Sequence, residues 1–178
     1  GPDTAERKLR FHMAYWVNPE RGEMFFAKKV IFVEGETEKS LFPFLARTLG
    51  CYSPDVSIVD CGSKFNLPLY ITIAKAFSIH YHVVHDEDPI PDSIPPTWDS
   101  SKITSKRRTY RLNVDIAALV DDSARITVSS PDFEDISGVS RGQGEKMGKA
   151  LAALEHFRAL PVSEYPAALV NLIRRVYG

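Results

Sequence analysis

Apolar and polar residues follow two recurring patterns along the chain: short apolar runs, and longer stretches with apolar positions at helical spacing. The apolar runs predict buried strands, because a strand covered on both faces of a sheet is apolar throughout. The predicted strands are 29–33, 56–60, 80–85 and 125–128. The helical spacing predicts helices over 5–18, 37–49, 67–78, 113–120, 145–159 and 167–177. Strands that alternate with helices predict βαβ units and therefore a parallel sheet.

This order of elements predicts one α/β domain with a mostly parallel four-stranded sheet, helices on both faces and an insertion after the third strand. We expect Thr37 to be the N-cap of the first helix after a strand, and Gly50 to end that helix. Gly1-Pro2 is typical of a scar left by tag removal, so we expect a piece of a longer protein. The parts are a leading helix and linker (1–28), a βαβαβ core (29–89), an insertion (90–124) and a last strand with closing helices (125–178).

The composition adds limits to this picture. With 178 residues and 44% apolar content, the chain can form a real core, and it contains neither a membrane-length apolar stretch nor a visible signal peptide. Two cysteines without a CxxC motif predict a reduced, cytoplasmic protein. The net charge of −1 does not indicate nucleic-acid binding, but the insertion carries a dense basic segment. Such a segment is a solvated surface unless the fold places it where phosphates bind.

Carboxylates follow the first and third predicted strands at the points where these strands end. Glu34 comes directly after the first strand, and Glu38 would lie in the first turn of the following helix. Asp86 and Asp88 follow the third strand, and on an extended segment their side chains would point the same way. The carboxyl ends of parallel strands form the edge at which α/β sheets bind ligands. Each acidic pair alone could be a surface turn, but acids converging at this edge predict a divalent-metal site.

Other motifs are weaker candidates. His80, His82 and His85 share one strand, but alternation puts the third on the opposite face, so core or surface positions are favoured over a metal trio. The glycine-rich segment 138–146 lacks Walker spacing and has no Ser or Thr after its lysine, which argues against an ATP site in this chain. Ser63 and Lys64 follow the end of the second strand and could contact phosphate or form only a turn.

The order of these motifs resembles the Toprim domain of topoisomerases, primases and some nucleases. The shared motifs are Val33-Glu34-Gly35-x-Thr37-Glu38 and Asp86-x-Asp88. The chain is more similar to the C-terminal Toprim domain of the overcoming lysogenization defect (OLD) family of nucleases. In that family a sequence segment similar to residues 24–30 directly precedes the VEGxTE signature. The resemblance extends from that segment to the helix around Lys146.

The resemblance implies a Mg²⁺- or Mn²⁺-dependent DNA nuclease with a two-metal mechanism. It also implies a later acidic residue, matched by Glu134 in preference to Asp132, and a lysine, matched by Lys146 in preference to Lys149 although the usual proline is absent. The implied metal ligands are Glu34, Glu38, Asp86, Asp88 and Glu134, and the implied catalytic residues are Glu34, Asp86 and Lys146. Glu34 could instead be a general acid/base, as in simpler Toprim enzymes. The DNA contacts would be Lys102, Lys106, Arg107, Arg108 and Arg111.

The resemblance further implies an upstream ATPase domain on the same polypeptide, a bacterial or phage-related source, and a full-length protein that could form a homodimer. Two alternatives stay open. One is a primase or topoisomerase type of Toprim fragment, although no tyrosine here has the recognisable setting of a nucleophile. The other is a non-catalytic Toprim-like module that binds nucleic acid or regulates a partner, although the complete acid set argues against it.

Overall fold

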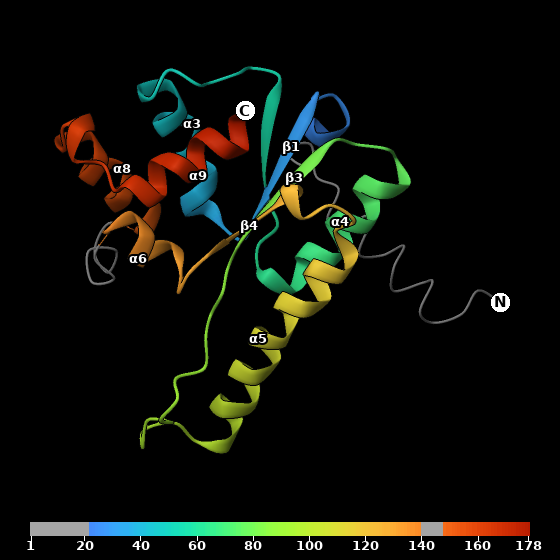
Figure 1. Cartoon of the computed structure of the whole chain (residues 1–178), viewed down its shortest axis with the longest axis vertical. Coiled ribbons are helices and arrows are strands. Elements are labelled where there is room, and N and C mark those ends of the chain that lie inside the picture. The colour runs from blue at the N-terminus through green and yellow to red at the C-terminus, as the bar shows by residue number, and fades with distance from the viewer. Residues whose placement is uncertain (1–21, 140–147) are drawn as a thin grey trace.

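A parallel four-stranded sheet forms the centre of the computed structural model, which describes residues 22–139 and 148–178 (Figure 1). The strands lie in the order β2-β1-β3-β4. Their bounds are β1 Lys29–Val33, β2 Val56–Asp60, β3 Tyr81–Asp86 and β4 Ile126–Ser129. The register pairs Val33 with Asp60 and Asp86 with Ser129, so the carboxyl ends of the strands meet at one edge. The predicted fold class is confirmed.

Helices cover both faces of the sheet because β1 is apolar on both sides. Ile31 and Val33 pack with three helices on one face: α3 (Glu36–Thr48), α8 (Lys149–Ala159) and α9 (Ala167–Tyr177). Val30 and Phe32 pack on the other face, against α4 (Leu67–Ala76) and the inner end of α5 (Ser100–Leu119). The short elements are η1 Glu23–Phe25, η2 Lys64–Asn66, η3 Ser123–Arg125, α6 Phe133–Ser137 and η4 Val162–Glu164.

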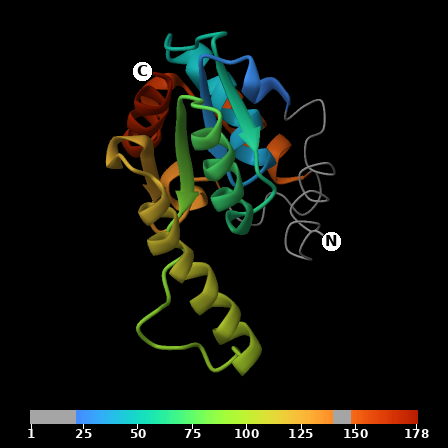
Figure 2. The same cartoon turned by 90° about the vertical axis from the view of Figure 1, so that its right-hand side faces the viewer.

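The predicted helix over 113–120 was wrong in extent, since one long helix runs from Ser100 to Leu119. Asp99 caps it, because its Oδ1 accepts a hydrogen bond from the Lys102 main-chain N–H at 2.7 Å. The inner end of α5 buries Ile116, whereas its outer half extends away from the sheet (Figure 2). A largely polar stretch outside the hydrophobic core has no apolar periodicity, which is why the pattern of the sequence indicated only the inner end.

Two further helix boundaries differ from the prediction. Gly35, and not Thr37, is the N-cap of α3, so this helix starts one residue before the predicted range. Gly148 has a φ of +81°, which is not helical, so α8 begins at Lys149 and not at residue 145. Leu49 is the C-cap of α3, and Gly50 follows it in the left-handed conformation typical of a helix end, with a φ of +72°. Residues 145–147 and the predicted helix over 5–18 lie outside the described residues.

Three composition-based expectations can be compared with the structure. Cys51 and Cys61 do not form a disulfide with each other. His82 and His85 are buried and His80 is exposed, as expected for core and surface positions. Of the helices in the described ranges, none has the length and apolar character needed to cross a membrane.

Candidate active site

Glu34 and Asp86 lie side by side at the carboxyl edge of the sheet. Glu34 directly follows β1, and Asp86 is the last residue of the neighbouring strand β3. The main-chain N–H of Asp86 donates to Glu34 Oε1 at 2.8 Å, and the Phe133 N–H donates to Asp86 Oδ1 at 2.9 Å. Each bond uses one carboxylate oxygen, so the second oxygen of each side chain can bind another partner.

Glu38 adds a third carboxylate from the first turn of α3, and it is more deeply buried than the half-buried Glu34 and Asp86, with only 8% of the residue exposed. Burial raises its pKa to about 7, with further contributions from the charges of Glu34 and Glu134. Burial also raises the pKa of Glu34 to about 7, against the opposing effects of the Asp86 N–H and the Lys64 ammonium. The three acids therefore share a crowded, poorly solvated volume.

The pKa of Asp86 is raised furthest, to about 8. Burial is the main cause, followed by the charges of Glu34 and Glu38, and then those of Asp88 and Glu134. Its ionised form is thus disfavoured both by lost solvation and by negative neighbours. A cation at this point would relieve both effects.

Glu134 approaches the same cluster from α6, after the last strand. Its charge contributes to the raised pKa of Glu34, Glu38 and Asp86. Asp132 instead caps α6, since its Oδ1 accepts from the Asp135 N–H at 3.0 Å. Of these two acids, Glu134 is therefore the one whose charge acts on the acidic cluster.

Lys149, the first residue of α8, lies beside Glu134. Its Nζ is 3.5 Å from Glu134 Oε1. Lys146, the lysine preferred on the family resemblance, lies outside the described residues. Lys149 is therefore the lysine of this segment that the described structure brings to the acids.

Asp88 does not follow the expected geometry. β3 ends at Asp86, and Asp88 has a φ of +53°, so the segment is not extended through both residues and the prediction of parallel side chains was wrong. An aspartate tolerates this left-handed conformation better than most residues, and the proline that follows disfavours the right-handed helical one. The Asp88 carboxylate contacts two lysines, Lys64 Nζ at 3.3 Å and Lys106 Nζ at 3.7 Å.

Lys64 is the site residue whose importance the sequence left undecided. It is 2% exposed, and its ammonium donates to the carbonyl oxygens of Asp86 and Glu87 as well as contacting Asp88. A buried ammonium requires such partners because desolvation is costly. Its position four residues after the end of β2, at the edge where the other strands end, was the available signal. Lys64 fixes the turn that carries both aspartates.

The five basic residues of the insertion all lie on α5. Lys106 reaches the acidic turn through Asp88, and Asn113 on the same helix donates to the Glu87 carbonyl at 2.8 Å. The others lie along the exposed part of the helix: Lys102, Arg107, Arg108 and Arg111. The structure therefore joins α5 to the acidic turn through Lys106 and leaves the remaining four cations exposed along the helix.

The donor set fits a hard divalent cation in its chemistry, since carboxylate oxygens are the ligands that Mg²⁺ and Mn²⁺ prefer. As the side chains lie, no three His, Cys, Asp or Glu residues within 22–139 and 148–178 form a ready chelate. The carboxylates of Glu34 and Asp86 accept hydrogen bonds from main-chain N–H groups, and that of Asp88 is paired with lysines. His85 is neutral, because burial lowers its pKa to about 4, and its Nδ1 is hydrogen-bonded to the Asp86 carbonyl at 2.8 Å.

Comparison with family models matches residues 25–88 to the TOPRIM domain of the overcoming lysogenization defect protein-like family. Residues 25–88 are therefore similar to an OLD-like Toprim domain. The match begins before β1 and ends at Asp88, so it contains Glu34, Glu38 and both aspartates of the acidic turn.

Two individual proteins are similar to the chain over most of its length. An OLD nuclease of Thermus scotoductus is 29% identical over 175 residues, which cover 94% of this chain and 32% of the relative. The chain thus spans about a third of the length of this curated relative. The solved C-terminal region of the Burkholderia pseudomallei OLD protein is 18% identical with a TM-score of 0.42, covering 86% of this chain and 88% of that one.

Proposed function

We propose that this OLD-like Toprim domain is a nuclease that cleaves DNA phosphodiesters with Mg²⁺ or Mn²⁺. The observation that carries the proposal is the convergence of Glu34, Glu38 and Asp86 at the carboxyl edge of the sheet, inside the segment that matches the Toprim family. Raised pKa values for several carboxylates in one volume are typical of functional sites. The similarity to an OLD nuclease supports the same reaction class.

Glu34, Glu38 and Asp86 would hold the metal, with Glu134 and Asp88 as further ligands. Two bound divalent ions supply an activated water and neutralise charge on the phosphate in such enzymes. The main-chain N–H of Asp86 holds the Glu34 carboxylate at the end of β1. In this position Glu34 could act either as a metal ligand or as a general acid/base, and the proposal includes both roles.

Lys149 is proposed as a fixed positive charge next to the scissile phosphate, a role that Lys146 could share. Lys149 contacts Glu134, so its ammonium lies at the border of the acidic cluster. A cation there would stabilise the negative charge that develops on the phosphoryl oxygens. Lys102, Lys106, Arg107, Arg108 and Arg111 would bind the DNA backbone along α5.

We also propose that this chain is one part of a longer polypeptide. Residues 1–178 would be the single Toprim-type catalytic unit of a longer polypeptide, as the 32% coverage of the relative suggests. An upstream ATPase domain would then regulate cleavage, and the full-length protein could act as a homodimer in the cytoplasm. A religation or primer-synthesis assay would detect the topoisomerase or primase alternative.

Plasmid cleavage tests the proposed function. The chain is incubated with supercoiled and linear DNA in Mg²⁺, Mn²⁺, Ca²⁺ or EDTA, together with Asp86→Asn and the control Asp55→Asn. Asparagine can still accept the Phe133 N–H, so Asp86→Asn removes charge with little loss of structure. Asp55 pairs with Lys28 near the amino ends of the strands, far from the carboxyl edge. We expect Mg²⁺- or Mn²⁺-dependent cleavage that disappears in Asp86→Asn alone. The absence of cleavage with every ion would overturn the proposal for this chain and favour the non-catalytic module.

A further inference from the structure

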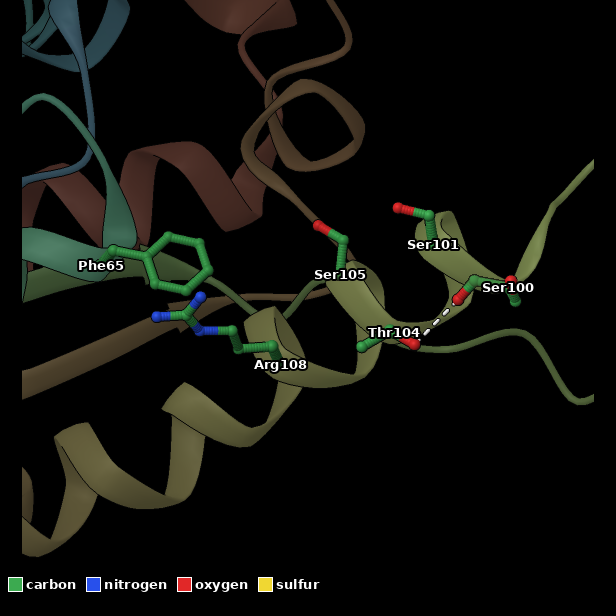
Figure 3. A pocket seen from close by; sticks show the side chains of 6 residues that line it. All are labelled: Phe65, Ser100, Ser101, Thr104, Ser105 and Arg108. Atoms are coloured by element: carbon green, nitrogen blue, oxygen red, sulfur yellow. Dashed lines mark hydrogen bonds between the residues drawn. The ribbon is translucent and has the colours of Figure 1, made fainter.

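An open groove of about 700 Å³ lies between η2 and the outer half of α5 (Figure 3). Its lining is an aromatic ring, a guanidinium group and four hydroxyl groups: Phe65, Arg108, Ser100, Ser101, Thr104 and Ser105. None of these residues belongs to the acidic cluster. The groove is therefore a second candidate site, built from groups that bind phosphates and flat rings.

The face of α5 that lines the groove is continuous with the face that enters the core. Toward the C-terminus of the helix, Leu112, Ile116 and Leu119 pack against the second core cluster. One and two turns earlier, the same face carries Arg108 and Ser105, at the i, i+3 and i+4 spacing that places side chains in one row. The row changes from apolar to polar where the helix leaves the body of the domain. This part of the helix is suited to a polar ligand and not to a protein core.

Phe65 supplies the aromatic surface. It lies in η2 and is 42% exposed, so part of its ring is open to solvent. The Arg108 guanidinium carbon lies 5.0 Å from the centre of the Phe65 ring (Figure 3). An exposed ring beside a cation is the combination that binds single-stranded nucleic acid, because any base can stack on the ring while the cation attracts the backbone.

The groove adjoins the acidic cluster through two short connections. Phe65 directly follows Lys64, whose ammonium contacts Asp86, Glu87 and Asp88. Lys106 contacts Asp88 and is two residues before Arg108 on the same helix. The helix carries five basic residues and one acidic residue, so its charge complements a phosphate backbone.

We propose that this groove binds an unpaired segment of the nucleic acid that the acidic cluster cleaves. A base stacks on Phe65, and neighbouring phosphates bind Arg108 and the serine hydroxyl groups of α5, because Thr104 already donates its hydroxyl proton to the Ser100 carbonyl. Bases inside a duplex are stacked on each other and cannot present a face to the ring, so the groove distinguishes single strands from duplexes. This inference rests on the proposed function for its substrate, but it concerns binding alone.

Equilibrium binding without divalent metal tests the inference separately from cleavage. Fluorescence anisotropy in EDTA measures the affinity of the chain for a labelled oligo-dT of about 12 nucleotides, within the usual range of single-strand site sizes. The same measurement uses a duplex of equal length and an oligo-U strand. The variants are Phe65→Ala, Phe65→Trp and Arg108→Ala. The matched control is Phe26→Ala, a phenylalanine 91% exposed just before the start of β1.

Phe65→Ala should weaken single-strand binding by roughly 5- to 100-fold, the range that corresponds to the loss of one stacked base. It should leave duplex binding nearly unchanged, and Phe65→Trp should retain the wild-type affinity. Arg108→Ala should weaken binding and lower the salt dependence by about 0.7 in log–log slope, as expected for one lost phosphate contact on a single strand.

Three results would overturn the inference: no single-strand binding by the wild type, an unchanged affinity in Phe65→Ala, or equal losses for single strands and duplexes. Oligo-U indicates whether the groove also accepts RNA, and equal binding of both strands would assign it to single strands of either kind. Because no metal is present, a failed plasmid cleavage assay does not affect this result. Likewise, a negative result for single-strand binding would not decide the proposed cleavage, which the Asp86→Asn plasmid assay tests separately.

Discussion

Replacing Glu38 by Gln should stabilise the domain at pH 8, although it removes a buried residue of the candidate active site. The ordinary pKa of a glutamate is 4.5, and burial with neighbouring acids raises that of Glu38 to about 7. The folded state therefore holds the proton more tightly than the unfolded state. The carboxylate costs no stability below about pH 4, and its cost grows as the pH rises through 7. Gln is isosteric and uncharged, so it removes this cost.

The size of the effect follows from the same pKa values. A pKa raised from 4.5 to about 7 corresponds to about 3 kcal/mol once the folded carboxyl is fully ionised. Glu34 and Glu134 contribute part of this through their own charges. We therefore expect a gain of about 1–3 kcal/mol at pH 8 and less than about 1 kcal/mol at pH 5. For a domain of this length, such a gain corresponds to a rise in Tm of about 3–10 °C.

Thermal unfolding followed by circular dichroism at pH 5 and pH 8, in EDTA, measures this gain. Glu36→Gln is the matched control, because Glu36 lies in the same first turn of α3 but is exposed. Both substitutions remove the same favourable interaction with the helix dipole, so their difference isolates the effect of burial. A Tm for Glu38→Gln that is equal to that of Glu36→Gln at pH 8, or lower, would refute the reasoning.

Other predictions concern the acidic turn, the core and metal binding. Lys64→Met should lower the free energy of unfolding, measured in urea, by about 1–3 kcal/mol, because the carbonyl groups and the carboxylate around the ammonium lose their donor. The control Lys28→Met breaks an exposed ion pair and should lower it by about 1 kcal/mol or less. Phe157→Ala should lower the free energy of unfolding by about 3–5 kcal/mol in the same assay, since the Phe157 ring is buried and its centre lies 5.1 Å from that of Tyr165. Leu151 is half-exposed, so Leu151→Ala should cost much less. Mn²⁺ should raise the Tm more at pH 8 than at pH 5, because protons compete for the same carboxylates; an equal rise at both values would count against an acidic site.

Much of the fold could be predicted from the sequence because the strands are buried on both faces. Continuous apolar runs such as 29–33 have few alternative interpretations, and the carboxylates directly after them had to lie at the carboxyl edge. The hydrogen bond between Glu34 and the Asp86 N–H is a direct consequence of β1 and β3 being neighbours. The proximity of these two acids therefore follows from strand order alone.

The remaining features depend on contacts that no local pattern encodes. Lys64 is separated by 22 residues from Asp86, whose carbonyl its ammonium contacts. The conformation of Asp88 depends on a turn that this lysine holds. The outer half of α5, residues 100–109, has Ile103 as its single aliphatic residue, so hydrophobic periodicity cannot reveal it as a helix. For the same reason, the groove beside Phe65 could not be predicted from the sequence.

Mn²⁺ binding is the most direct test of the claim that these carboxylates form a metal site. Electron paramagnetic resonance of free Mn²⁺, at pH 8, gives the affinity of the wild-type chain, of Asp86→Asn and of the surface control Asp55→Asn. The account predicts binding by the wild type and the control, and a loss of roughly tenfold or more in Asp86→Asn. Equal binding by wild type and Asp86→Asn, or no binding by either, would contradict it.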